Sequence, residues 1–167
     1  LNVDGMYPIS GQKDFAIATV YELNDFTEEA IKDVMERYPQ YNVEIKSPTS
    51  TGTEDFSYSQ AGIAAIVASD VDYENSNYEK NIYHSSMDSK EYGYNPEVFK
   101  MVHELFTNIL LCLDESEVRP LNFTAEITAL EESLNKDIIN EEHAIYDAVE
   151  NAKAAAAALD SKIKSGE

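Results

Sequence analysis

The sequence predicts an α/β protein, organised as a partial three-layer sandwich with a mostly parallel sheet that is followed by C-terminal helices. Strand-like and helix-like segments alternate over residues 1–119, which is the pattern of a sheet covered by helices. The run GIAAIVAS at residues 62–69 is continuously apolar, as in a strand buried on both faces. Only helical periodicity remains over residues 120–167. We therefore expect two units, 1–119 and 120–167.

Four segments have the pattern of strands. Residues 1–5 (LNVDG) read as a short strand that ends at Asp4, and residues 13–21 (KDFAIATVY) form a second candidate. Residues 41–46 (YNVEIK) alternate apolar and polar side chains, which indicates a half-exposed strand. Residues 62–69 complete the set. Functional groups in such sheets lie in loops at the carboxyl ends of the strands, so the loops after these segments are the places to look for a site.

Two helices are expected among these strands. Asp25 is predicted to cap the first helix, with Glu28 in a capping-box position, and Pro39 ends it. Asn95 is predicted to cap the second, whose first residue is Pro96. The second helix looks fully packed, and its apolar residues are Val98, Phe99, Val102, Leu105, Phe106, Ile109 and Leu113.

Composition restricts the class of partner. The formal net charge is −20, and such a field repels nucleic acid and anionic membrane, which both require neutralising lysine and arginine. The acidity is read as a solvated surface that keeps the protein soluble, in preference to a specific cationic partner. No stretch approaches the roughly 18 continuous apolar residues of a membrane span. Cys112 lies in an apolar helical run and is expected to be a small buried hydrophobe, and a single cysteine permits no disulfide within the chain.

The C-terminal unit has two helical stripes. The first stripe consists of Phe123, Ile127, Leu130 and Leu134. The second is a heptad-like seam with alanines at its centre, formed by Ile145, Val149, Ala152, Ala156, Leu159 and Ile163. This seam predicts either a homodimer or interdomain contact, or packing on the chain's own helices, and the pattern leaves both readings open.

The residues that could carry chemistry are individually weak candidates. His84 lies in a polar loop. A histidine there is usually a surface residue, and the more specific interpretation is a metal ligand. Asp4, at the end of a strand, suits either a metal ligand or the cap of a turn. Glu54 and Asp55 read as carboxylates at a helix N-terminus. His103 is expected to be structural or exposed, and so is His143, which lies near the start of the last helix.

Three segments taken in order resemble one family. They are LNVDG, then GTEDFSYSQAGIAA, then the stretch that begins YHSSMD and runs through PLNFT to residue 134. Together they look like the C-terminal half of a co-catalytic zinc exopeptidase, in the branch of the glutamate carboxypeptidases and the transferrin receptor. The resemblance covers about residues 1–135, and residues 83–134 carry its most specific part.

The resemblance implies a site with two zinc ions. The aspartate of NVD, here Asp4, would be a terminal ligand of one zinc, and the histidine of YHS, here His84, of the other. Carboxylate oxygen and neutral imidazole are both zinc ligands, and two close zinc ions polarise a peptide carbonyl and generate hydroxide near neutral pH. Tyr83 would lie beside the peptide substrate. We further expect Asp88 to hold the second nitrogen of the histidine.

The resemblance also implies a substrate pocket, and it implies that this chain carries only part of the zinc site. The loop that lines the pocket consists of Gly52, Thr53, Glu54 and Asp55. The family's remaining zinc ligands and its general base precede the NVD strand and are not among these residues, so each zinc keeps one ligand. We expect the chain alone neither to hydrolyse peptides nor to bind zinc well. The segment GIAAIVASD lacks the arginines of the glutamate-specific relatives, which favours a broader aminopeptidase as the parent protein.

Three functions follow from these readings. The leading one is a C-terminal fragment of a zinc-dependent aminopeptidase, a hydrolase, that acts on N-terminal peptide bonds, is itself inactive, and dimerises through its C-terminal helices. The alternative is a non-catalytic, transferrin-receptor-like binding and dimerisation module. The third is an acidic helical interaction module without a site. Relatives are often secreted or face outward, so an extracellular parent is the expectation from the resemblance alone.

Overall fold

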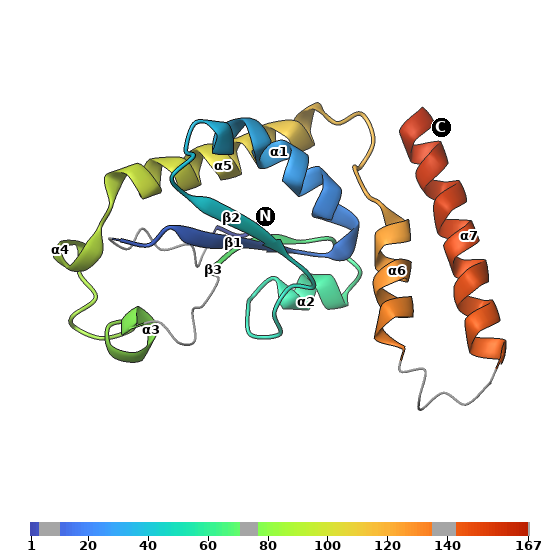
Figure 1. Ribbon diagram of the computed structural model, residues 1–167, viewed down its shortest axis with the longest axis horizontal. Helices are drawn as coiled ribbons and strands as arrows, with labels where there is room; N and C mark the ends of the chain where they lie inside the picture. The colour runs from blue at the N-terminus through green and yellow to red at the C-terminus, as the bar shows by residue number, and fades with distance from the viewer. Residues whose placement is uncertain (4–10, 71–76, 135–142, 167) are drawn as a thin grey trace.

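The computed structural model describes residues 1–3, 11–70, 77–134 and 143–166 of the chain (Figure 1). It confirms an α/β protein with a small sheet and several helices. Its elements are β1 (Asp14–Thr19), the 3-10 turn η1 (Tyr21–Leu23), α1 (Asn24–Glu36), β2 (Asn42–Lys46), α2 (Phe56–Gln60), β3 (Ile66–Asp70), α3 (Asn77–Asn81), α4 (Lys90–Gly93), α5 (Pro96–Glu115), α6 (Phe123–Ser133) and α7 (His143–Ser165). None of the helices among these residues is long and apolar enough to cross a membrane.

The sheet is mixed. Its strand order is β2-β1-β3, with β1 parallel to β2 and antiparallel to β3, so a mostly parallel sheet is not confirmed. Residues 1–3 run alongside β3, where Asn2 and Val67 form a parallel bridge. The Asn2 amide donates to the carbonyl of Ile66 at 2.8 Å, and the Ala68 amide donates to the carbonyl of Asn2 at 3.0 Å. The segment that leads to Asp4 therefore has the direction of β3.

Helices α1 and α5 cover one face of the sheet, and α2 lies on its other side (Figure 1). Alternation along β1 points Phe15 and Ile17 at these two helices, where they meet Val34 of α1 and Met101 and Leu105 of α5 in one core cluster. All five side chains are almost completely buried. Each burial of this kind contributes about 1.5–3 kcal/mol, which makes this cluster the main source of stability for the α/β body.

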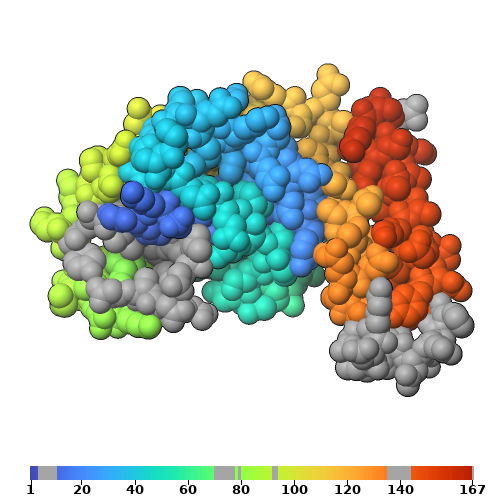
Figure 2. Space-filling model, viewed as in Figure 1, coloured from blue at the N-terminus to red at the C-terminus, as the bar shows by residue number. Residues whose placement is uncertain are grey.

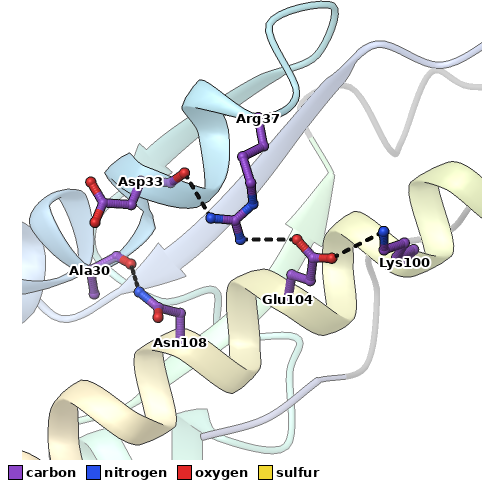
Figure 3. Close-up of polar contacts among 6 residues, drawn as sticks. All are labelled: Ala30, Asp33, Arg37, Lys100, Glu104 and Asn108. Atoms are coloured by element: carbon purple, nitrogen blue, oxygen red, sulfur yellow. Dashed lines mark hydrogen bonds and ion pairs between the residues drawn. The ribbon is translucent and has the colours of Figure 1, made fainter.

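Polar contacts fix α1 against α5 at the edge of that core (Figure 3). Arg37 donates to Glu104 at 3.0 Å, and Lys100 lies 3.5 Å from the same carboxylate. The hydrogen bond from Arg37 holds the pKa of Glu104 below its usual value. Asn108 donates to the carbonyl of Ala30 at 2.6 Å. Exposed ion pairs contribute little, so these contacts set the orientation of the two helices more than their stability.

The predicted cap of α1 is wrong. Asp25 does not cap the helix, because η1 runs directly into α1, which already begins at Asn24. The Asp25 carboxylate instead accepts a hydrogen bond from Asn122 at 2.7 Å, across the junction with α6.

The predicted start of α5 is confirmed. The Asn95 side chain accepts from the amides of Glu97 and Val98 at 3.0 and 3.3 Å, and Pro96 is the first helical residue. Full packing of this helix is wrong at one predicted position. Phe99 is 44% exposed, and its ring lies against that of His103 on the outer face, with 4.1 Å between the centroids.

Helices α6 and α7 form a hairpin beside the α/β body, with α6 nearer the body (Figure 2). Asp160 of α7 caps the start of α6. Its carboxylate accepts from the amides of Phe123 and Thr124 at 2.8 and 2.9 Å and from the Thr124 hydroxyl at 2.5 Å. Asn122 adds an ordinary N-cap by accepting from the amide of Ala125. The chain's own α6 thus accounts for part of the predicted seam on α7.

Candidate functional site

His84 lies in the turn that follows α3, in an unusual backbone conformation. Its φ is 57°, in the left-handed region, which costs a residue other than glycine about 1–2 kcal/mol. The imidazole is exposed and stacks on the ring of Tyr83, with 3.9 Å between the centroids. No hydrogen bond reaches the imidazole from any residue that the structure describes. Strain retained at a polar residue of this kind points to a role other than packing.

The rest of this turn is tied together by short polar contacts. The Tyr78 hydroxyl donates to Asp88 at 2.9 Å, and the Ser85 hydroxyl donates to the carbonyl of Ile82 at 2.6 Å. Within the described parts of the chain, no hydrogen bond joins Asp88 to His84, so the role expected for Asp88 stays a prediction. Tyr78 was missed from the sequence, because its contact with Asp88 depends on the path of the whole turn.

Asp4 lies outside the described residues, but residues 1–3 before it are described. Asn2 pairs in parallel with Val67, and parallel strands end at the same edge of a sheet. The chain therefore leaves residue 3 in the same direction in which β3 leaves the sheet. Helices α3 and α4 lie beyond that end of β3 (Figure 1).

The predicted pocket loop is a compact turn. The Gly52 amide donates to the hydroxyl of Ser50 at 3.2 Å, and the Thr53 hydroxyl donates to the carbonyl of Ser50 at 2.9 Å. Asp55 holds the N-cap position of α2, yet its side chain makes no capping hydrogen bond. The structure thus confirms Asp55 as a carboxylate at a helix N-terminus, although its side chain does not cap the helix.

A cleft of about 400 Å³ opens beside this loop. Its lining consists of Leu1, Asn2, Glu54, Asp55, Tyr58, Ile63, Ala64 and Ala65. Asp55 is only 5% exposed, and both of its carboxylate oxygens are closed to solvent and have no hydrogen-bond partner among the described residues. Leu1, Tyr58 and Ile63 are large apolar or aromatic residues that are exposed around the cleft. The cleft thus combines an unpaired buried acid with an apolar rim.

The structure brings together some of the predicted site residues. Glu54 and Asp55 line the cleft, whereas Gly52 and Thr53 support the turn from outside its lining. Tyr83 and His84 belong to the separate turn after α3 and are not part of that lining. Among the residues described, no three histidine, cysteine, aspartate or glutamate side chains are grouped to hold a metal ion.

Comparison with known protein families, with curated proteins and with solved structures gives no match for this chain. The order of the sequence motifs and the geometry described above are therefore what supports a function.

Proposed function

We propose that this chain is the C-terminal portion of a zinc-dependent aminopeptidase that hydrolyses N-terminal peptide bonds through two zinc ions. The order of the motifs NVD, GTEDF with GIA, and YHS supports this proposal. The observation that carries it in three dimensions is the parallel pairing of Asn2 with Val67. That pairing sets residues 1–3 parallel to β3, which precedes the His84 turn in the sequence. Functional groups in α/β proteins gather at the carboxyl ends of such strands, which supports the proposal.

The residue types fit zinc. Asp4 would hold one ion and His84 the other, and the exposed imidazole of His84 is free of hydrogen bonds within the described chain. When bound, such ions polarise a peptide carbonyl and lower the pKa of a coordinated water. This chain offers one ligand to each ion, and structural or catalytic zinc sites use three or four, so we expect weak binding and no peptide hydrolysis by the chain alone.

Tyr83 extends the proposal to the substrate. Its ring stacks on His84 and so lies beside the proposed metal ligand, where a bound peptide would pass. The mostly parallel sheet in three layers that the resemblance implies also belongs to the proposal.

A cobalt titration tests the metal ligands. We expect Co²⁺, which replaces Zn²⁺ and absorbs visible light, to bind the wild-type chain weakly and to shift the imidazole NMR signals of His84. His84→Ala should remove the Co²⁺ ion that His84 holds and leave any ion at Asp4. His103→Ala is the matched control, since His103 is also exposed and its ring nitrogen bonds to the carbonyl of Phe99 on its own helix.

Two results contradict the proposal. Co²⁺ binding that is undiminished in His84→Ala, or no effect on His84 at millimolar Co²⁺, removes His84 as a ligand. Two tightly held zinc ions in the purified chain would overturn the view that the chain carries only part of the site.

A second candidate is a non-catalytic, transferrin-receptor-like binding and dimerisation module. The observation that favours it is the hairpin, because Leu130 on α6 and Ile145 and Leu159 on α7 remain exposed although α6 and α7 pack together. We propose that these residues form a homodimer contact, which is compatible with either function.

A further inference from the structure

His84 keeps a backbone conformation that needs support from its surroundings. Its φ of 57° is unfavourable for a residue with a Cβ, and such residues persist only where neighbouring contacts over-determine them. The turn supplies backbone contacts, since the amides of Ile82 and Tyr83 donate to the carbonyl of Tyr78 at 2.8 and 2.9 Å. Ile82 is 3% exposed and anchors the start of the turn. These contacts fix the path of the chain, but they do not fix the imidazole, which is exposed.

A row of four side chains leads from the far end of this turn back to the imidazole. Asp88 accepts a hydrogen bond from the Tyr78 hydroxyl at 2.9 Å. The Tyr78 ring lies 5.8 Å from the ring of Tyr83, at an interplanar angle of 46°. Tyr83 in turn stacks on His84, with 3.9 Å between the centroids and an interplanar angle of 20°. Tyr78 is buried, whereas Asp88 and His84 are exposed, so Tyr78 links the acid to the ring that covers the imidazole.

We propose that Tyr78 is the positioning residue for the imidazole of His84. With its hydroxyl held by Asp88, the Tyr78 ring keeps its tilted contact with Tyr83, and Tyr83 then fixes the plane of the imidazole. The lone pair of an imidazole nitrogen lies in the plane of the ring, so the stack also sets the direction in which a metal ion binds. Asp88 thus acts on His84 through two tyrosines and not through a hydrogen bond to its second nitrogen.

The use of this geometry for zinc rests on the proposed function, whereas the positioning itself needs no metal. Metal-free NMR of the intact chain therefore tests it. The imidazole protons of His84, identified by their absence in His84→Ala, should be shifted upfield by the ring of Tyr83. Tyr78→Phe removes only the hydroxyl and should move these signals toward those of an unstacked histidine. Tyr58→Phe is the matched control, because it removes the hydroxyl of an exposed tyrosine on α2 and should leave the His84 signals unchanged.

Substitutions at Asp88 separate an indirect contact from a direct one, at a pH where the imidazole is neutral. Asp88→Asn keeps an oxygen that accepts from the Tyr78 hydroxyl and should retain the wild-type signals, whereas Asp88→Ala should act as Tyr78→Phe does. The two changes remove the same hydrogen bond, so combining Tyr78→Phe with Asp88→Ala should have no greater effect than either alone. Because Asp88 is exposed, Asp88→Ala keeps the test valid if Tyr78→Phe disturbs the fold.

The opposite pattern would overturn the proposal. If Asp88 bonds the imidazole directly, Asp88→Asn should displace the His84 signals and Tyr78→Phe should leave them in place. Unchanged His84 signals in both Tyr78→Phe and Asp88→Ala would also remove the positioning role.

A metal titration keeps this proposal distinct from the zinc site. Tyr78→Phe should weaken the binding of Co²⁺ at His84 about tenfold, because the imidazole must then be ordered when the ion binds. Equal Co²⁺ affinity of wild type and Tyr78→Phe would retain the zinc site and overturn the positioning role. A failed cobalt test, with His84 signals that still depend on the Tyr78 hydroxyl, would retain the positioning and remove the zinc site.

Discussion

Asp55 and Asp160 are both buried, and they differ in what surrounds them. Burial alone would raise the pKa of Asp160, but hydrogen bonds from Thr124 and from the amide of Phe123 outweigh it and hold the pKa below its ordinary value. The stability that Asp160 contributes is therefore present above that ordinary value and is lost as the pH falls through the lowered pKa. Asp55 has no such donor within the part of the chain that the structure describes.

The same substitution should thus have opposite effects at these two sites. Asp55→Asn removes an unpaired buried charge, and we expect the free energy of unfolding to rise by about 1 kcal/mol. Asp160→Asn weakens the hydrogen bonds that the carboxylate accepts and should lower the free energy of unfolding by about 1–3 kcal/mol. Urea unfolding at neutral pH measures both. A loss of stability in Asp55→Asn would mean that Asp55 has a stabilising partner.

At the scale of elements, one side of α7 packs against α6 of the same chain, and the opposite side has no described contact. Val149 and Ala156 are buried, whereas Leu159, in the same predicted seam, is 45% exposed. Alanines between these positions permit the close approach of another helix. The two readings of the seam are therefore compatible, since α6 covers part of it and the rest is available to a second copy.

We expect the wild-type chain to be a dimer in size-exclusion chromatography with light scattering. Leu159→Lys should shift it to a monomer, because a charge would then lie in the contact. Ala157→Lys on another exposed position of α7 serves as the control for added charge. A wild-type chain that stays monomeric at high concentration would remove the dimer contact.

At the scale of the whole molecule, the hairpin joins the α/β body through an acidic junction. The Asn122 amide donates to the carbonyl of Glu22 at 2.8 Å, and Asn122 also bonds Asp25. Burial, a hydrogen bond with Glu22 and the charge of Glu22 raise the pKa of Glu126 on α6. Asp25 and Asp160 are the other acids at the start of α6. Protonation of Glu126 therefore favours the joined arrangement.

The sign of the resulting pH dependence follows from the raised pKa. The contribution of Glu126 is fully present below its ordinary value of 4.5 and is lost as the pH rises through the raised pKa. Glutamine does not ionise, so Glu126→Gln should keep its free energy of unfolding as the pH rises. The variant should therefore become more stable than the wild type at the higher pH values. Glu132→Gln, exposed on the same helix, is the control. Urea unfolding between pH 4 and 7 measures the effect, and identical pH curves for Glu126→Gln and the wild type would contradict it.

The parts of the fold that depend on residues close together in the sequence could be predicted, and the parts that depend on distant contacts could not. The Asn95 cap of α5 needs only neighbouring residues and was predicted correctly, and so was the α/β class. The cap at Asp25 was wrong because η1, which is packed against α6, moves the start of α1. Apolar periodicity carries no strand direction, so the antiparallel pairing of β1 with β3 was not predictable.

The candidate site shows the same division. The sequence motifs pointed to the turn with Tyr83 and His84 and to the loop before α2. They could not show that Asp55 lacks a partner or that Tyr78 holds Asp88, because both facts depend on segments that meet only in the folded chain. Likewise, Asp160 was missed as a cap because the helix that it caps lies earlier in the chain.

The central place of β1 constrains the order in which the protein takes shape. β1 is the first strand after residues 1–3, yet its two neighbours, β2 and β3, follow only after α1 and α2. During synthesis β1 must therefore wait, with its apolar residues exposed, until β3 has emerged. The hairpin closes between adjacent helices, and such local contacts form faster than distant ones. The contact between α6 and α7 can thus form almost as soon as both helices have emerged, while β1 is enclosed only after a long delay.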